Sequence, residues 1–291
     1  MTMGNLMPPL LLIHPVGVGL SGRFWDRFIL EYREADPDTV LVAPDLLGCG
    51  NQLNIWQADN DNSAHRPLTH VEWSKQLVEV IRSHIKEPVV LVVQGASLPI
   101  ALEMLKNAPD DILGIVSFVP PSWKVMSEEM NSLTSQLLWK FLFASPLGQV
   151  LYLWLRRREF LKSFSIKELF DNPEDVDEEW LSMLKEGSRH RSTRWAVFSF
   201  LIGSWRKDWR PILTNLKKPT LILMGKKATG VGRSASIDNA KERINTYSKF
   251  MPEAEIRVID GRNVLPYERA KESAHAVRQW CSSELKLAKS K

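Results

Sequence analysis

The chain has 291 residues, of which 44% are hydrophobic and 25% are charged, so it can bury a large core. Its net charge of +4 is too small to indicate a protein that binds nucleic acid. The two cysteines, Cys49 and Cys281, lie far apart and without metal-ligand spacing. We therefore expect free thiols in a reducing compartment, no metal site and no cofactor.

The start of the chain lacks the charged segment and long apolar run of a signal peptide. No run of 18 uncharged apolar residues could span a membrane. The sequence thus predicts a cytoplasmic protein, or one of an organelle stroma, without signal peptide or transmembrane segment. It does not indicate an oligomeric state.

Short apolar runs alternate with helical patterns in the first part of the chain. Strands are expected at Pro8–Ile13, Val40–Ala43, Val89–Val93 and Ile112–Val119. A helix is expected over Val71–Ile85, with Thr69 as its N-cap, after a polar surface loop at residues 52–69. This alternation predicts an α/β fold with a mostly parallel sheet flanked by helices.

The pattern changes between Ser122 and Arg210, where no strand signal occurs and seven of the eleven tryptophans lie. Helices are expected there at residues 137–143, 150–155, 180–184 and 194–202. Strands return at 220–224 and 256–259, with helices from about Ser236 to Phe250 and from about Glu268 to Leu287. The sequence therefore predicts an all-helical cap, residues 122–210, inserted into a core of residues 1–121 and 211–291.

The stretch from Pro88 to Ala101 is a buried-strand pattern that turns sharply into a helix at Gly95, Ala96 and Ser97. This order of strand, turn and helix is where an α/β-hydrolase carries its nucleophile. Further segments resemble that superfamily, in particular its capped, epoxide-hydrolase and haloperoxidase-like members. They are His14–Gly17, Phe24–Trp25, Pro44–Asn51, Pro219–Gly225 and Gly261–Glu268, so the resemblance extends over nearly the whole chain.

The resemblance implies an α/β-hydrolase fold and a pocket beside an oxyanion-type loop. The residues that it assigns to this region are His14, Pro15, Val16, Gly17, Gly95 and Ala96. Two alignments with the family pattern Gly-x-Ser-x-Gly are open at the turn. In the first, Ser97 is the nucleophile; in the second, which keeps strand and helix in register, Gly95 occupies the nucleophile position. We favour the second, because glycine best tolerates the strained positive φ of such a turn.

The residues at the family's acid and base positions also indicate that the catalytic triad is absent. The family carries an acid after the strand that ends at Gly225, where this chain has Ala228. It carries a histidine in the loop after Gly261, where this chain has Val264. The triad positions therefore read Gly95 (or Ser97), Ala228 and Val264, and a serine without a base is a poor nucleophile.

Three functions follow as hypotheses. The first is a pseudoenzyme that binds an apolar or amphipathic small molecule, or a protein partner, in the cleft under the cap. The alternative is a serine hydrolase of esterase or lipase type that uses Ser97. A third is an enzyme with a non-standard site in the same cleft. Its candidate residues are His14, Cys49, Arg262, Asn263 and Tyr267.

One segment of the cap joins aromatic and apolar residues to a basic cluster. Trp154 is followed by Arg156, Arg157 and Arg158, a combination that interfacial helices use on membranes. A peripheral membrane contact through these residues is one interpretation. The other, which we favour from the sequence, is that the apolar faces pack inward and the arginines form a solvated rim.

Overall fold

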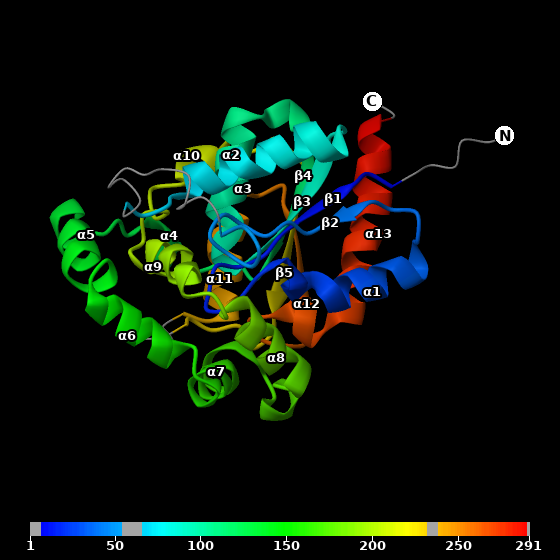
Figure 1. The fold of residues 1–291 in the computed structure, drawn as a ribbon. Coiled ribbons are helices and arrows are strands. Elements are labelled where there is room, and N and C mark those ends of the chain that lie inside the picture. Colours follow the sequence, from blue (N-terminus) through cyan, green and yellow to red (C-terminus); the bar gives the residue numbers. More distant parts are fainter. Residues whose placement is uncertain (1–6, 54–65, 232–237, 290–291) are drawn as a thin grey trace.

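The computed structural model describes residues 7–53, 66–231 and 238–289, the last five of these by their backbone alone. Six strands form one parallel sheet in the order β2-β1-β3-β4-β5-β6, as Figure 1 shows. The strands are β1 (Leu10–Ile13), β2 (Leu41–Val42), β3 (Val89–Gln94), β4 (Ile112–Phe118), β5 (Thr220–Gly225) and β6 (Glu255–Ile259). The predicted parallel sheet is confirmed.

The central strands are buried on both faces, as their unbroken apolar runs predict. Every residue of β1, β3 and β5 is buried, whereas the edge strand β6 is partly exposed. Helices α1 and α13 pack against each other, as do α2 and α3, and Figure 1 shows the two pairs on either side of the strands. The flanking helices are α1 (Asp26–Ala35), α2 (His70–Val80), α3 (Leu98–Asn107), α11 (Ala240–Phe250), α12 (Leu265–Glu268) and α13 (Ala270–Lys289).

The predicted N-cap of α2 is present. The Thr69 side chain accepts a hydrogen bond from the Val71 amide at 3.2 Å, and Glu72 accepts one from the Thr69 amide at 2.9 Å. This reciprocal pair is a capping box, which satisfies donors that the first turn leaves free. The start that we predicted for α11, at Ser236, and most of the polar loop at residues 52–69 lie outside the described residues.

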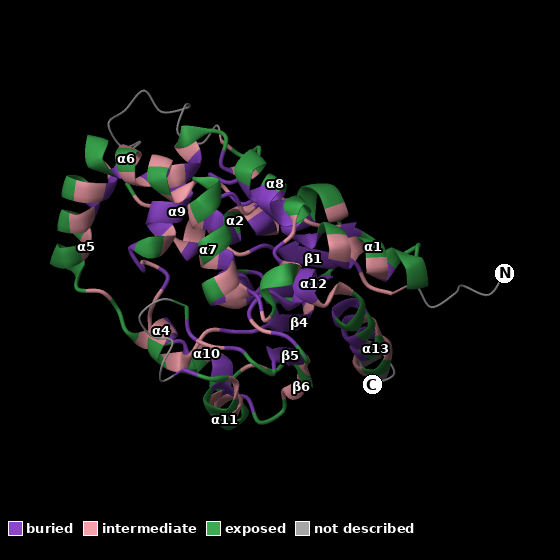
Figure 2. Ribbon diagram, turned by 90° about the horizontal axis from the view of Figure 1, so that it is seen from below, coloured by how far each residue is buried: buried purple, intermediate pink, exposed green. Residues whose placement is uncertain are grey.

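Between β4 and β5 the regular structure consists of helices only. They are α4 (Trp123–Ser127), α5 (Ser132–Leu138), α6 (Pro146–Leu155), α7 (Arg158–Phe164), α8 (Glu178–Gly187), α9 (Arg194–Leu201) and α10 (Arg210–Thr214), with shorter turns between them. Part of this segment has a small core of its own, made by Trp139, Phe143, Tyr152, Trp195, Val197, Phe198 and Ile202. Buried and exposed faces alternate along these helices in Figure 2. The division of the chain into a core and a cap stays a prediction.

Candidate functional site

A cavity of about 410 Å³ lies where the parallel strands end. Each strand from β1 to β6, except the short edge strand β2, is followed by a loop that contributes to its wall: Gly17 after β1, Gly95 after β3, Val119 after β4, Thr229 after β5 and Val264 after β6. The carboxyl ends of parallel strands are the usual place for a ligand in α/β folds. The sheet therefore sets both the position and the floor of this cavity.

Helices between β4 and β5 form the opposite wall of the cavity. All but seven of the described lining residues are apolar or glycine. The helical wall includes Val125, Leu155, Phe160, Phe164, Trp180, Val197 and Trp205. Such a lining favours an apolar molecule, or the apolar part of an amphipathic one.

The turn between β3 and α3 has its tip at Gly95. Gly95 has a φ of +57°, and a Cβ atom added there would meet no atom within 4 Å. A positive φ at a strand-to-helix turn is the strained conformation in which this kind of elbow presents a nucleophile. The space into which a nucleophile would project is thus present at Gly95, without a side chain to fill it.

Ser97 lies two residues after Gly95, at the end of the 3₁₀ turn Gly95–Ser97. Its side chain is buried and does not line the cavity. The Ser97 hydroxyl donates a hydrogen bond to the backbone carbonyl of His14 at 2.8 Å. This bond ties the elbow to the end of β1, which is a structural role.

His14 is also held within the structure. The Leu46 amide donates to Nε2 at 3.0 Å, so Nδ1 carries the proton and donates to the Pro15 carbonyl at 2.9 Å. Burial lowers the pKa of His14, which keeps the ring neutral. Both ring nitrogens are therefore engaged, while Pro15, Val16 and Gly17 line the cavity beside Ala96.

The positions assigned to the acid and the base lie close to the elbow. The Gln94 side-chain amide donates to the Asn263 carbonyl at 2.7 Å, and the Thr229 amide donates to Asn263 Oδ1 at 3.3 Å. These bonds join the residues next to Gly95, Ala228 and Val264, so the ends of β3, β5 and β6 meet there. Glycine, alanine and valine cannot transfer a proton. Their assignment to the three catalytic positions stays a prediction.

The cavity wall contains polar groups that the sequence did not single out. Gln94 is 3% exposed and its Oε1 has no hydrogen-bond partner among the described residues. Arg206 also lines the cavity, its Nε has no partner there, and burial lowers the pKa of its guanidinium. The third feature is an ion pair between Asp238 and Arg243. Gln94 could have been found from its place directly before the elbow; nothing in the sequence marks Arg206.

The residues considered for a non-standard enzyme are held in structural roles. Burial raises the pKa of the Cys49 thiol, which makes a thiolate unfavourable. The Tyr267 hydroxyl donates to Asp177 at 3.0 Å, and the Arg262 guanidinium donates to Thr229 Oγ1 at 2.9 Å. Asn263 lines the cavity, but its Nδ2 donates to the Glu168 carbonyl at 2.7 Å.

The described residues contain neither a cluster of metal ligands nor a helix that could span a membrane. Within the described part of the chain, no three His, Cys, Asp or Glu side chains gather closely enough to bind a metal ion. Among the same residues, no helix combines the length and the apolar character that crossing a membrane requires.

Comparison with known proteins assigns the family. A model described as the alpha/beta hydrolase family matches residues 10–277, and the chain therefore belongs to this family. No curated protein sequence matches the chain.

Solved structures agree on the fold. A bromoperoxidase from Bacillus anthracis is 16% identical with a TM-score of 0.68, over 96% of this chain and 93% of that one. A thermophilic esterase from Thermogutta terrifontis is 17% identical with a TM-score of 0.65, over 94% and 89%. A meta-cleavage product hydrolase from Pseudomonas fluorescens is 14% identical with a TM-score of 0.66, over 94% and 90%. At these identities the likeness concerns the fold alone.

Proposed function

We propose that this protein binds an apolar or amphipathic small molecule in the cavity and does not use a Ser-His-Asp triad. The observation that carries the proposal is the combination of a 410 Å³ apolar cavity with an elbow whose tip is Gly95. In catalytically active α/β-hydrolases this elbow carries the nucleophile. Here the same turn leaves open space, which a bound molecule can occupy.

Hydrogen-bonding groups of the cavity favour an amphipathic molecule. Gln94 Oε1 is a buried acceptor without a donor, a state that costs about 1–3 kcal/mol unless a partner is supplied. A hydroxyl or amide of the ligand can supply it. Arg206 gives the wall a positive charge, and its Nε has no hydrogen-bond partner among the described residues, although the charge of Glu128 acts on it; this guanidinium suits an acidic group of the ligand. We therefore infer a ligand with an apolar body, a hydrogen-bond donor and an acidic end.

The first experiment separates binding from catalysis. The purified protein is incubated with a fluorophosphonate probe and with short p-nitrophenyl esters, and ligand binding is followed with the fluorescent probe anilinonaphthalene sulfonate. We expect no labelling, no ester hydrolysis above background, and saturable probe fluorescence. Saturable labelling at Ser97, abolished in Ser97→Ala, would establish the serine hydrolase instead.

Filling the cavity with a large side chain tests where the probe binds, and the same substitution outside the cavity wall is the matched control. Val125 lies in the cavity wall, so Val125→Trp should weaken probe binding by about tenfold, a loss of ~1.4 kcal/mol. Val40 is 51% exposed and lies outside the wall, so Val40→Trp should bind the probe as the wild type does. Equal binding by all three proteins, each shown to be folded by circular dichroism, would place the probe elsewhere and contradict the proposal.

A further inference from the structure

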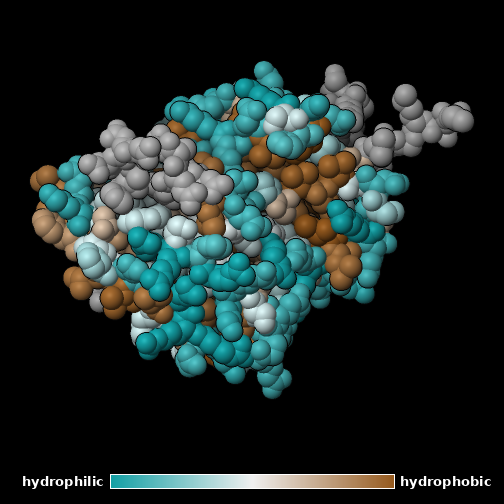
Figure 3. All heavy atoms as spheres, viewed as in Figure 1, coloured by the Kyte–Doolittle hydropathy of each residue, from teal (hydrophilic) through white to brown (hydrophobic). Residues whose placement is uncertain are grey.

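Helices α5 and α6, joined by the π-helical segment Trp139–Phe143, carry an exposed apolar surface. Among the described residues, six of the eleven exposed large hydrophobic side chains belong to it. They are Leu133 (69% exposed), Leu137 (56%), Phe141 (63%), Leu147 (64%), Val150 (65%) and Trp154 (47%), and together they define the α5–α6 surface. Figure 3 shows apolar side chains gathered over α5 and α6 at the left edge of the molecule.

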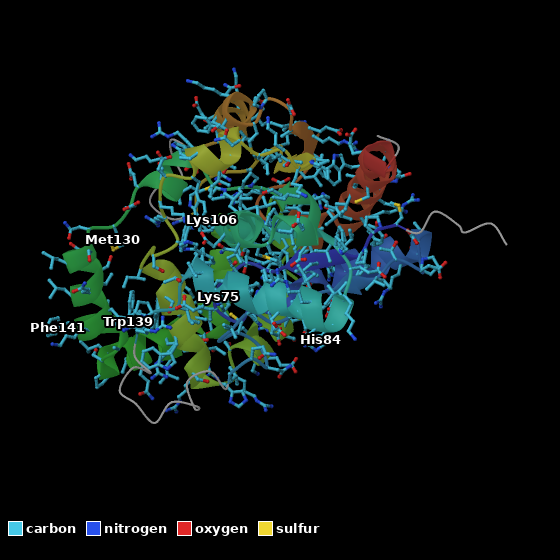
Figure 4. All side chains as sticks on the ribbon, turned by 90° about the horizontal axis from the view of Figure 1, so that it is seen from above. Lys75, His84, Lys106, Met130, Trp139 and Phe141 are labelled. Atoms are coloured by element: carbon cyan, nitrogen blue, oxygen red, sulfur yellow. The ribbon has the colours of Figure 1, made fainter. Side chains whose placement is uncertain are left out.

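The spacing of these residues places them on one side of each helix. Leu133, Leu137 and Phe141 are four residues apart, and Leu147, Val150 and Trp154 follow at intervals of three and four. The opposite side of the two helices is already packed, since Trp139 and Tyr152 are buried in the small core with α9. Figure 4 shows Phe141 directed away from the body of the molecule and Trp139 on the other side of the helix. Folding therefore does not require the outer stripe to be apolar.

The charged residues within the stretch that forms this surface all have one sign, although Glu128, Glu129 and Glu159 flank it. No Asp or Glu occurs from Asn131 to Arg158, whereas Lys140, Arg156, Arg157 and Arg158 lie within that stretch. Arg156 donates to the Arg189 carbonyl at 3.1 Å, and Arg158 pairs with Glu178. Arg157 is exposed, and its side chain makes no hydrogen bond or ion pair with the described residues. Lys140 and Arg157 are thus available to an anionic partner.

We propose that the α5–α6 surface docks on an anionic membrane, with the two apolar stripes in the headgroup and acyl boundary. Six apolar side chains beside unpaired cations are what interfacial helices need to lie in the plane of a bilayer. Trp154 stands next to the arginines, in the arrangement where an aromatic ring sits at headgroup level. We therefore prefer the membrane contact to the inward packing that we favoured from the sequence, and we extend the contact surface from α6 to α5.

Charge argues against a second copy of the chain as the occupant. A symmetric dimer would bring this surface against itself. Lys140 and Arg157 would then lie near their own copies without an acidic residue between Asn131 and Arg158 to neutralise them. An anionic lipid surface supplies the missing negative charge over the whole area, at a benefit of about fivefold in affinity per cation.

The docking surface continues into the wall of the cavity. Leu155 ends α6 and lines the cavity, as do Phe160, Leu161 and Phe164 of the next helix. A membrane under α6 would therefore lie next to the wall that encloses the ligand proposed above. This link depends on the proposed function; the docking itself does not.

The test is flotation of the purified protein with vesicles of phosphatidylcholine containing about 30% phosphatidylglycerol, against phosphatidylcholine alone. We expect binding to the anionic vesicles that falls as salt is raised. Phe141→Ser combined with Leu147→Ser should abolish flotation. Leu30→Ser, a change at a 62% exposed position on α1, should leave it unchanged. Equal flotation by wild type and the Phe141, Leu147 variant would overturn the proposal.

A second pair of variants tests the charges. Lys140→Gln combined with Arg157→Gln should lower the partition constant for anionic vesicles by about 25-fold, because each cation contributes about fivefold. Probe binding in the cavity should not change, which distinguishes failure of docking from failure of the proposed function. Unchanged vesicle binding of this variant would contradict docking by charge. Absence of flotation, with a dimer in sedimentation equilibrium that Phe141→Ser and Leu147→Ser dissociate, would replace the membrane by a second copy.

Discussion

Gly95 has the backbone geometry of an elbow tip but no side chain that could act as a nucleophile. The turn holds a φ of +57° there, which costs a residue with a side chain about 1–2 kcal/mol and costs glycine nothing comparable. In an active member of the family, that strain serves to present a nucleophile. In this chain, glycine relieves the strain while β3 and α3 remain in place.

Rebuilding the triad tests this interpretation directly. Gly95→Ser, Ala228→Asp and Val264→His together should create ester hydrolysis at least about 100-fold above that of Gly95→Ser alone, because the serine gains a base and the base an orienting acid. The open space at Gly95 accommodates the new hydroxyl. Hydrolysis of p-nitrophenyl esters and fluorophosphonate labelling at position 95 provide the measurement.

The single variant is the control for the rebuilt site. Gly95→Ser should remain unlabelled, since His14, with both ring nitrogens engaged, cannot take its proton. Should the folded triple variant be no more active than the single one, Ala228 and Val264 do not stand at the acid and base positions. Our assignment of those two residues would then be wrong.

At the scale of elements, the strands and helix ends that depend on a local sequence pattern could be predicted. The strands β1, β3, β4 and β5 were predictable because each is a short, mostly apolar run. The N-cap at Thr69 was predictable because its chemistry is local. A pocket beside the His14 loop was expected from the resemblance to α/β-hydrolases and not from a local pattern. Which of two nearby residues forms the elbow tip stayed open, because the choice rests on backbone geometry at Gly95. Arg206 could not be predicted, since its neighbours come from distant parts of the chain.

One long-range interaction fastens α11 to the end of β4. Arg243 donates to both carboxylate oxygens of Asp238, at 2.6 and 2.9 Å, and to the Pro120 carbonyl at 3.2 Å. The side chains of Arg243 and Asp238 are only 5% and 7% exposed. Such a pair contributes mainly by compensating two charges that folding has removed from water.

Removing one partner should therefore cost more than removing both. Arg243→Met leaves the Asp238 carboxylate buried without its counter-charge, and should lower the free energy of unfolding by about 3–5 kcal/mol. Arg243→Met with Asp238→Leu removes both charges and should recover most of that loss. Urea unfolding of the wild type, of each single variant, Arg243→Met and Asp238→Leu, and of the double variant measures the difference. Additive effects of the two substitutions would show that the pair is not coupled.

At the scale of the whole molecule, the sheet is innermost, the cavity lies outside it, and the α5–α6 surface lies outside the cavity. The sheet positions the loops, the loops and helices enclose the cavity, and α6 belongs to both the cavity wall and the outer surface. The stability of this arrangement depends on groups that must stay neutral when buried. His70 is the clearest of them, because neither of its ring nitrogens has a hydrogen-bond partner among the described residues.

Acid should destabilise the protein through His70. Burial lowers the pKa of His70 to about 4, with the Lys207 charge acting in the same direction and Glu103 against it. Its ordinary value is 6.5, so between pH 6.5 and about 4 the unfolded chain binds a proton that the folded protein does not. Stability must therefore fall as the pH falls through this window, with a slope of about 1.4 kcal/mol per pH unit for one such group.

His70→Gln removes this contribution and should reduce the slope of unfolding free energy by about 1.4 kcal/mol per pH unit between about pH 6 and 4.5. His14, whose pKa is also lowered by burial, leaves a remaining slope of the same sign. Above about pH 7.5 both histidines are neutral in either state, so the two curves should run parallel. Urea unfolding across this pH range measures both regions. Equal slopes below pH 6 would mean that His70 is already charged in the folded protein, as an ion pair with Glu103, whose Oε2 lies 3.6 Å away.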